Sequence, residues 1–302
     1  MESLSFASPK QIPAGALSVG YVEAGPAYGT PVILLHGWPY DIHCFSDAAQ
    51  LLVSSGYRVI VPYLRGYGPT RFLSNETPRK GDQTVFALDT IALMDALKID
   101  RAILGGFDWG GRAADIVAAL WPERCKALVS VSGYQIINLQ ATQRPLPPAA
   151  ELGWWYLFYF ATERGRAGYS QNRHDFNKLI WKLASPKWAF DDATYARSAV
   201  AFDNPDHADI VIHNYRWRLG LAEGQPQFDD PAAKLQQAPI ISVPTITIGS
   251  DFDGTAADGA AYRAKFSGKY AHRTLIGIGH NVPAEAPQAF AAAIIDADAL
   301  AT

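Results

Sequence analysis

The 302-residue sequence contains only two cysteines, Cys44 and Cys125. They lie far apart in the chain, match no metal-ligand spacing and cannot make the disulfide framework of a small secreted protein. We therefore expect two buried, reduced thiols and no metal site built on cysteine.

Long apolar runs and an excess of basic charge are also missing. No segment has 18 consecutive apolar residues, which argues against a membrane-spanning helix. The first 20 residues have neither a basic start nor a long apolar stretch, so we expect no secretory signal and a cytoplasmic protein. With 26 basic and 29 acidic residues the formal net charge is -3, which provides no positive field for nucleic acids or acidic membranes. A small, mostly uncharged partner fits this balance better.

Short apolar runs that end in glycine or polar turns recur along much of the chain. They alternate with segments of helical periodicity, such as 45–56 and 84–99. This alternation predicts a parallel sheet covered by helices on both faces, and so the α/β class. The expected strands lie within 31–39, 57–68, 101–106, 125–133, 243–251 and 271–279, and a helix over 285–300 closes the chain.

The alternation stops between residues 134 and 239. Strand-like runs disappear there, aromatic residues accumulate, and five of the eight tryptophans fall within this segment. Most of these rings are expected to fill a core of their own. We predict two units: a core domain formed by 1–133 and 240–302, and an inserted helical cap formed by 134–239.

The stretch GGFDWGGR, residues 105–112, joins an expected strand to an expected helix. Small residues crowd a sharp turn of the kind on which many hydrolases place a nucleophilic serine. Here the central residue is Asp108. A phosphate-binding loop would need a Lys-Ser/Thr ending and would not carry a carboxylate at its centre. A helix-capping aspartate is the structural alternative to a nucleophile.

Asp108 suits a nucleophile that needs no base, because an unperturbed aspartate is ionised at neutral pH. A carboxylate can attack a saturated carbon that bears a leaving group, which leaves an ester between protein and substrate. Hydrolysis of that ester needs an activated water, and His280 in GIGHNVP, beyond the last expected strand, is the expected base. An earlier loop, GSDFDG, offers Asp251 and Asp253 as the acid that orients the histidine.

Ester hydrolysis also develops an oxyanion, which needs N–H donors. In elbows of this kind the residue after the nucleophile supplies one donor, so the backbone N–H of Trp109 is the first candidate. The second candidate is the backbone N–H of Trp38, in the loop that follows the run VILLHG. Neither role depends on the indole ring.

Three motifs together resemble the α/β-hydrolase-fold epoxide hydrolases: HGWP at 36–39, LRGYG at 64–68 and DWGG at 108–111. The resemblance spans nearly the whole chain and implies the α/β-hydrolase fold, in which nucleophile, acid and histidine follow in that order. In related hydrolases the acid lies nine residues after the proline that opens its strand. That proline is Pro244 here, which favours Asp253 over Asp251.

Epoxide hydrolases of this type use two cap tyrosines to hold and protonate the epoxide oxygen. WYLFYF resembles the first tyrosine motif and implies Tyr156, with Tyr159 three residues on as the alternative. NYRW resembles the second motif and implies Tyr215. A hydroxyl donor suits epoxide opening, because the alkoxide that develops must be protonated.

The resemblance therefore implies an epoxide hydrolase that adds water to a small apolar epoxide, with no cofactor and no metal. Nothing in the sequence indicates an oligomer. Two features depart from the family pattern: Phe107 stands where a histidine often precedes the nucleophile, and the acid loop has the doubled DFD. Neither departure removes a required group.

A haloalkane dehalogenase is the alternative, because such enzymes share the elbow and the HGWP stretch. Trp109 with Trp154 or Trp155 would then bind the halide, but the asparagine usual after HG is Trp38 here. A non-catalytic ligand-binding member of the fold is a third possibility, which a complete set of nucleophile, acid, histidine and oxyanion donors disfavours.

Overall fold

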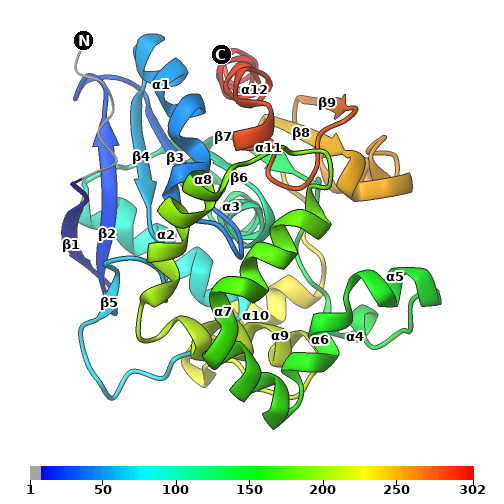
Figure 1. Ribbon diagram of the computed structural model, residues 1–302. Coiled ribbons are helices and arrows are strands. Elements are labelled where there is room, and N and C mark those ends of the chain that lie inside the picture. The colour runs from blue at the N-terminus through cyan, green and yellow to red at the C-terminus, as the bar shows by residue number, and fades with distance from the viewer. Residues whose placement is uncertain (1–7) are drawn as a thin grey trace.

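A nine-stranded mixed sheet forms the centre of the computed structural model, which describes residues 8–302 (Figure 1). The strands run in the order β1-β2-β4-β3-β6-β7-β8-β9, and the short β5 pairs with β2. The pairs β1–β2, β2–β4 and β2–β5 are antiparallel, whereas all pairs from β4 to β9 are parallel. The strands are β1 (Lys10–Ala14), β2 (Leu17–Ala24), β3 (Pro31–Leu35), β4 (Arg58–Pro62), β5 (Arg71–Phe72), β6 (Ala102–Gly106), β7 (Cys125–Val131), β8 (Thr245–Ser250) and β9 (Tyr270–Leu275).

The parallel strands confirm the predicted α/β class. The central ones consist of apolar and β-branched residues buried on both faces; residues 32–35 of β3, for example, are fully buried. Such strands are continuous apolar runs, which is why the sequence reveals them. The antiparallel strands β1 and β2 were not predicted, because β1 is mostly exposed at the sheet edge and its sequence, KQIPA, forms no apolar run.

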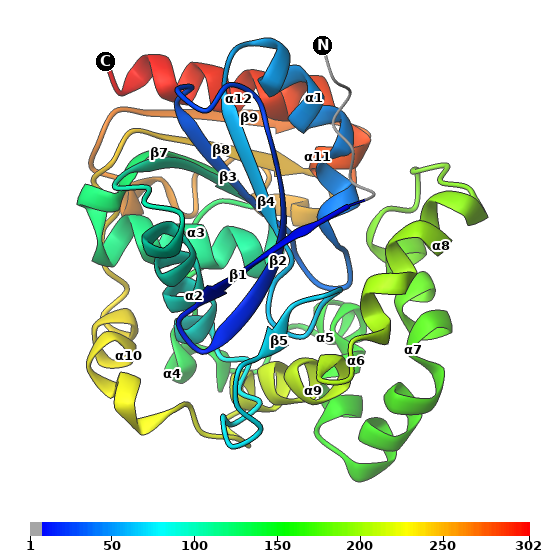
Figure 2. The same cartoon turned by 90° about the vertical axis from the view of Figure 1, so that its left-hand side faces the viewer.

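Helices cover both faces of the sheet (Figure 2). On one face α1 (Ser46–Ser54) packs against α11 (Val282–Glu285) and α12 (Pro287–Leu300), and on the other α2 (Gln83–Ala96) packs against α3 (Asp108–Leu120). No helix within residues 8–302 combines the length and the apolarity needed to cross a membrane. Cys44 and Cys125 are both buried as free thiols.

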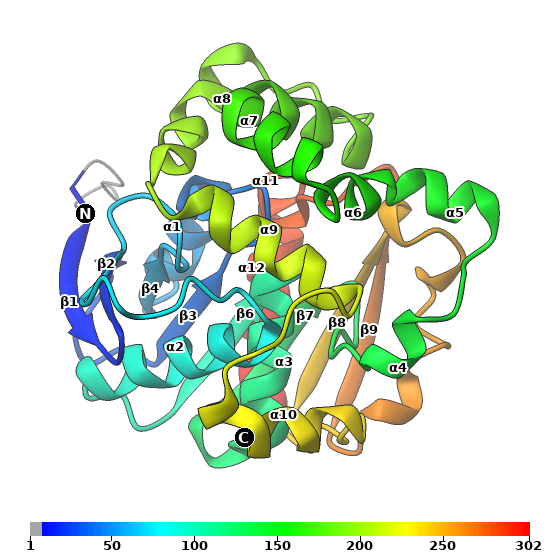
Figure 3. The same ribbon diagram turned by 90° about the horizontal axis from the view of Figure 1, so that it is seen from below.

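The chain between β7 and β8 contains helices and no strand of the sheet, as predicted. Figure 3 shows α6, α7, α8 and α9 gathered beside one end of the sheet, and α6, α7 and α9 contact one another. The boundaries 134 and 239 of a separate cap domain remain a prediction. The inserted helices are α4 (Leu139–Thr142), α5 (Pro148–Gly153), α6 (Trp155–Phe160), α7 (Glu163–Ala184), α8 (Asp192–Ala199), α9 (His207–Arg218) and α10 (Asp229–Gln236).

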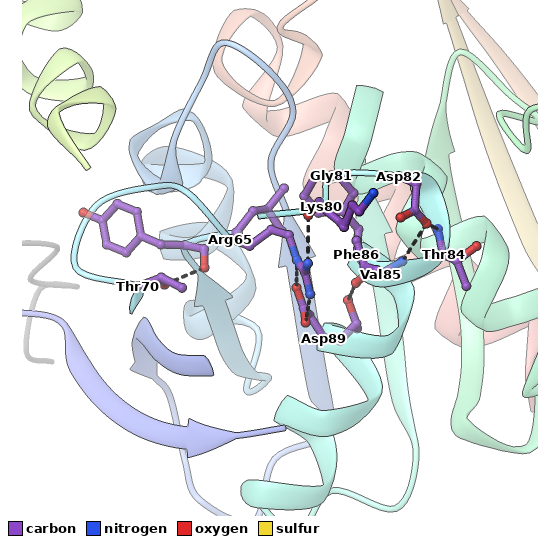
Figure 4. Close-up of polar contacts among 12 residues, drawn as sticks. Arg65, Thr70, Lys80, Gly81, Asp82, Thr84, Val85, Phe86 and Asp89 are labelled. Atoms are coloured by element: carbon purple, nitrogen blue, oxygen red, sulfur yellow. Dashed lines mark hydrogen bonds and ion pairs between the residues drawn. The ribbon is translucent and has the colours of Figure 1, made fainter. Parts of the chain in front are cut away.

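The LRGYG loop after β4 is tied to α2 by a buried arginine (Figure 4). The Arg65 guanidinium donates from Nε and Nη2 to the two carboxylate oxygens of Asp89, at 2.6 and 2.7 Å, and from Nη1 to the Lys80 carbonyl at 2.8 Å. Asp82 caps the start of α2 by accepting from the backbone N–H of Thr84. The bidentate pair fixes the loop in one orientation, since both charged groups are held by two bonds.

Candidate active site

The stretch 105–112 forms the predicted strand-to-helix elbow. Asp108 follows β6, begins α3 and has a positive φ of 52°. Glycine is required at positions 110 and 37 because other atoms lie too close for a side chain. A Cβ on Gly110 would lie 2.0 Å from the Leu35 carbonyl oxygen, and one on Gly37 would lie 2.4 Å from the Asp108 Cβ. Strained backbone at such a turn is held by its surroundings and projects the side chain above the end of the sheet.

The two carboxylate oxygens of Asp108 have different surroundings. Oδ1 accepts the backbone N–H of Trp38 at 2.7 Å, while Oδ2 faces His280 Nε2 at 3.7 Å. Burial raises the pKa of this carboxyl, but the facing imidazole, the charge of Arg112 and the Trp38 N–H together lower it below its usual value. Asp108 is therefore ionised at neutral pH, with Oδ1 held and Oδ2 directed at the histidine.

The His280 loop is held by Ser185, which is distant in sequence, and by Glu285 in the helix that follows the loop. Its backbone N–H donates to Ser185 Oγ at 2.9 Å, just beyond α7. Glu285 in α11 accepts from Ser185 Oγ at 2.6 Å and from the Gly279 N–H at 2.7 Å. The imidazole lies 4.1 Å, centroid to centroid, from the ring of Phe252. The histidine is thus fixed by its backbone and by ring contact.

The two predicted tyrosines lie next to each other, and both are close enough to Asp108 to respond to its charge. Tyr156 in α6 and Tyr215 in α9 are both buried, and their ring centroids are 5.3 Å apart. Burial raises the pKa of both hydroxyls, and the negative charge of Asp108 adds to this, while the charge of Arg218 acts in the opposite direction. Each hydroxyl therefore keeps its proton and is able to donate it.

Tyr159, the alternative to Tyr156, points elsewhere. A Cβ on Gly168 would lie 1.9 Å from the Tyr159 hydroxyl oxygen, so this hydroxyl lies against α7. Its ring stacks on Phe176 with the planes 15° apart. The structure therefore favours Tyr156 as the first tyrosine of the site.

Most of the predicted site residues line one cavity of about 670 Å³. Tyr215 and Trp109 are not on its wall; both lie buried behind it, with ring centroids 6.0 Å apart. Within residues 8–302, no group of three His, Cys, Asp or Glu side chains is placed to hold a metal ion. Residues that line the cavity include Trp38, Asp108, Trp154, Trp155, Tyr156, Ile180, Phe252, Asp253 and His280.

The sequence model of the alpha/beta hydrolase fold matches residues 30–287. The chain belongs to this family. A crystal structure described as a "putative epoxide hydrolase" from Klebsiella pneumoniae subsp. pneumoniae MGH 78578 is similar to this α/β hydrolase over 99% of this chain and 100% of the other, with 57% identity and a TM-score of 0.97. The resemblance to epoxide hydrolases inferred from HGWP, LRGYG and DWGG is thereby confirmed.

Other relatives are less similar to this α/β hydrolase. AB hydrolase superfamily protein YfhM of Bacillus subtilis is 27% identical over 70% of this chain and 74% of its own length. Epoxide hydrolase 2 of Siraitia grosvenorii is 36% identical over 38% of this chain, and the match spans only 35% of that protein. A mutant epoxide hydrolase structure from Solanum tuberosum has a TM-score of 0.75 at 19% identity, which shows the shared fold alone.

Neither candidate acid bonds to His280 in this α/β hydrolase. Asp253 lines the cavity, and its Oδ2 accepts the Ser250 N–H at 2.8 Å. Asp251 pairs with Lys187 at 2.7 Å, and its side chain is 39% exposed. His280 Nδ1 is buried and has no hydrogen-bond partner among residues 8–302. The geometry thus places Asp253 at the cavity and Asp251 in a surface ion pair, and the identity of the acid remains a prediction.

We expect Asp253→Asn to slow ester hydrolysis by about 10²- to 10⁴-fold, because the imidazolium formed on His280 loses its stabilising charge. Asp251→Asn should change the rate little and the free energy of unfolding by less than about 1 kcal/mol, since it removes an exposed ion pair. Steady-state kcat and urea unfolding of both variants check this. The reverse ranking of kcat would assign the role to Asp251.

The Trp38 ring connects its own loop to two of the helices between β7 and β8. Its Nε1–H donates to the Tyr169 hydroxyl at 2.9 Å, and that hydroxyl lies 2.9 Å from His207 Nε2. His207 Nδ1 lies 2.9 Å from the Gly66 carbonyl, which only accepts, so Nδ1 carries the ring proton. Burial lowers the pKa of His207 to about 3 and keeps the ring neutral. The loop that presents the Trp38 N–H is therefore anchored to α7 and α9.

Sequence reasoning missed Ser185, Glu285, Tyr169 and His207. Ser185, Tyr169 and His207 act through other residues across long stretches of sequence, such as the 95 residues that separate Ser185 from His280. No local motif marks them. The only sequence signal is weak: Glu285 follows GIGHNVP closely, in α11.

Proposed function

We propose that this α/β hydrolase is an epoxide hydrolase that converts an epoxide into a vicinal diol. The proposal rests on one observation above all, the adjacency of two protonated tyrosines, Tyr156 and Tyr215, to the ionised carboxylate of Asp108. An epoxide needs a nucleophile at carbon and a proton donor at oxygen, and these three groups supply both.

In the first step Asp108 Oδ2 attacks a ring carbon of the epoxide. The carbon–oxygen bond of the ring breaks, and the oxygen that leaves takes a proton from one tyrosine while the other donates a hydrogen bond. Oδ2 is the attacking atom because Oδ1 is already held by the Trp38 N–H at 2.7 Å. The product is an alkyl ester whose carbonyl oxygen, Oδ1, faces that donor.

In the second step water attacks the Asp108 carboxyl carbon. His280 Nε2, which faces Oδ2 at 3.7 Å, takes the proton of the water. Negative charge develops on Oδ1, where the backbone N–H groups of Trp38 and Trp109 stabilise it. Collapse of this intermediate breaks the bond between the carboxyl carbon and Oδ2, which leaves with the diol and takes the proton from His280. The Asp108 carboxyl then releases the remaining proton of the water, and the tyrosinate formed in the first step takes up a proton, so both groups return to their starting states.

Haloalkane dehalogenation is the second candidate, because one observation favours it. The Trp109 indole Nε1 is buried and has no hydrogen-bond partner among the described residues. A halide is an acceptor that such a donor would bind. Halide departure, however, would make no use of the paired tyrosines Tyr156 and Tyr215.

A turnover screen separates these candidates. The purified protein is incubated with aryl and alkyl epoxides and with haloalkanes of similar size, and diol and halide are measured, with Asp108→Ala as the matched control. We expect diol from the epoxides, little halide, and no product from the control. Halide alone would identify a dehalogenase. No product from any substrate would indicate a ligand-binding member of the family.

A further inference from the structure

A second cavity, of about 750 Å³, lies on the other side of Trp154. Trp154 lines both cavities, and its ring centroid is 5.8 Å from that of Tyr156. The second cavity is bounded by segments from α4 to α6, the end of α9 and Lys265. It therefore begins one aromatic ring away from the proposed site of epoxide opening.

The charged residues of this cavity are mainly basic. Arg144, Arg218 and Lys265 line it, and Glu151 is its one acidic residue. The Glu151 carboxylate already accepts the backbone N–H of Leu146 at 2.7 Å. No ion pair within 4.0 Å among residues 8–302 involves any of the three cations. The cavity thus has an excess of positive charge that the protein itself does not neutralise.

Arg218 has the most unusual environment of the three. Its Nε is buried without a hydrogen-bond partner, and its guanidinium carbon lies 5.2 Å from the Trp154 ring and 5.7 Å from the Tyr215 ring. Arg112 is buried beside it and also has an unpartnered nitrogen, Nη1. Unpaired buried guanidinium donors are costly, and a carboxylate is the group that matches their geometry.

The two guanidinium groups also repel each other. Burial first, and then the charge of Arg218, lowers the pKa of Arg112 to about 10, while Asp108, Tyr215 and Asp115 act in the opposite direction. An anion bound at Arg218 would offset this repulsion. The unpartnered donors and the basic lining of the cavity therefore both favour a negatively charged ligand.

We propose that the second cavity binds a carboxylate on the substrate, so that the preferred epoxides carry a carboxylate at the end of a chain that passes Trp154. This inference rests on the proposed epoxide hydrolase function and specifies its substrate class. The epoxide ring lies over Asp108, the chain runs along Trp154, and Arg218 binds the carboxylate with support from Arg144 and Lys265. The substrate is thus anionic, and not wholly apolar as the sequence analysis expected.

The test compares terminal epoxides that end in a carboxylate with the neutral primary amides of the same chain length. A charge-assisted hydrogen bond contributes about 1.5–3 kcal/mol, so the best acid should exceed its amide in kcat/KM by about 10- to 100-fold. In Arg218→Gln this ratio should fall to near one. Because Arg218 also lies beside Tyr215, the variant should slow both substrates, and only the ratio reports on carboxylate binding.

Two further variants keep the test decisive. Lys234→Gln, which removes one exposed positive charge on α10 outside this cavity, should leave the acid-to-amide ratio unchanged. The double variant Arg144→Gln/Lys265→Gln should lower the ratio without touching the tyrosines, and it replaces Arg218→Gln if that protein does not fold. A ratio near one in the parent protein at every chain length, or an unchanged ratio in both cavity variants, would overturn the proposal.

Failure of the proposed function gives a different result. If no epoxide is turned over, the hydrolase assignment fails, and calorimetry with a simple alkanoate still tests the cavity. Binding of the alkanoate that is lost in Arg218→Gln would support the carboxylate site on its own. Equal turnover of acids and amides would instead retain the epoxide hydrolase and reject the carboxylate site.

Discussion

In His280→Gln, the protein incubated with an epoxide is expected to gain the mass of one substrate molecule. Asp108 is ionised without help from a base, so ester formation should continue, whereas hydrolysis loses its general base and should slow by about 10²- to 10⁴-fold. The His280 imidazole helps to lower the pKa of Asp108, so the experiment is best run at about pH 8, where the carboxylate stays ionised in its absence. Intact mass spectrometry and peptide mapping measure the adduct and its position.

His174→Gln is the matched control. His174 is an exposed cap histidine paired with Asp203 at 2.8 Å, so this variant should turn over at the parent rate and carry no adduct. Slow turnover by His280→Gln with unmodified protein would mean that His280 does not act after ester formation. An adduct on a residue other than Asp108 would reject the assigned nucleophile.

Replacing both cap tyrosines is expected to give the largest loss in ester formation. Tyr156→Phe and Tyr215→Phe each remove one hydroxyl and keep the ring, and because the partner compensates, each single loss should be at or below about 10²-fold. In the double variant no donor remains for the alkoxide, so the loss should be well beyond 10²-fold, at about 10⁴-fold. Single-turnover kinetics locate the loss in formation of the Asp108 ester.

Tyr159→Phe is the control for this pair, since it makes the same change on α6, the helix that carries Tyr156, at a hydroxyl that lies against Gly168. It should form the ester at close to the parent rate. Reaction with a haloalkane, if any occurs, should show no comparable loss in the double variant because halide leaves unprotonated. If the double variant opens epoxides at the parent rate, the epoxide hydrolase proposal fails.

The sequence predicts those parts of the fold that a local residue pattern defines. The parallel strands are buried on both faces and so form apolar runs, as in residues 102–106 of β6. The edge strand β1 has exposed polar residues and is recognisable only by its pairing with β2, which is information that the sequence does not carry locally. The helical insertion was visible because strand-like runs stop there, but its exact limits depend on contacts across the chain.

The site residues also fall into two groups: those that a local motif marks and those that only their contacts identify. Asp108, Trp38 and His280 lie at strand ends within recognisable motifs, and the structure brings them together. The acid does not follow from the motif alone, because Asp251 and Asp253 are two residues apart and differ only in what they contact. Arg218 could not be predicted as a binding residue either, because a single arginine in a helix has no recognisable role until its neighbours are known.

The central claim is that water attacks the enzyme and not the substrate. In a single turnover with excess protein in ¹⁸O-labelled water, one label should enter the Asp108 carboxylate, and the diol should carry none, because its new oxygen is the former Oδ2. Mass spectrometry of the peptide that contains Asp108 and of the diol measures both. Label in the diol, with an unlabelled Asp108 peptide, would show direct attack of water on the epoxide and would contradict the account.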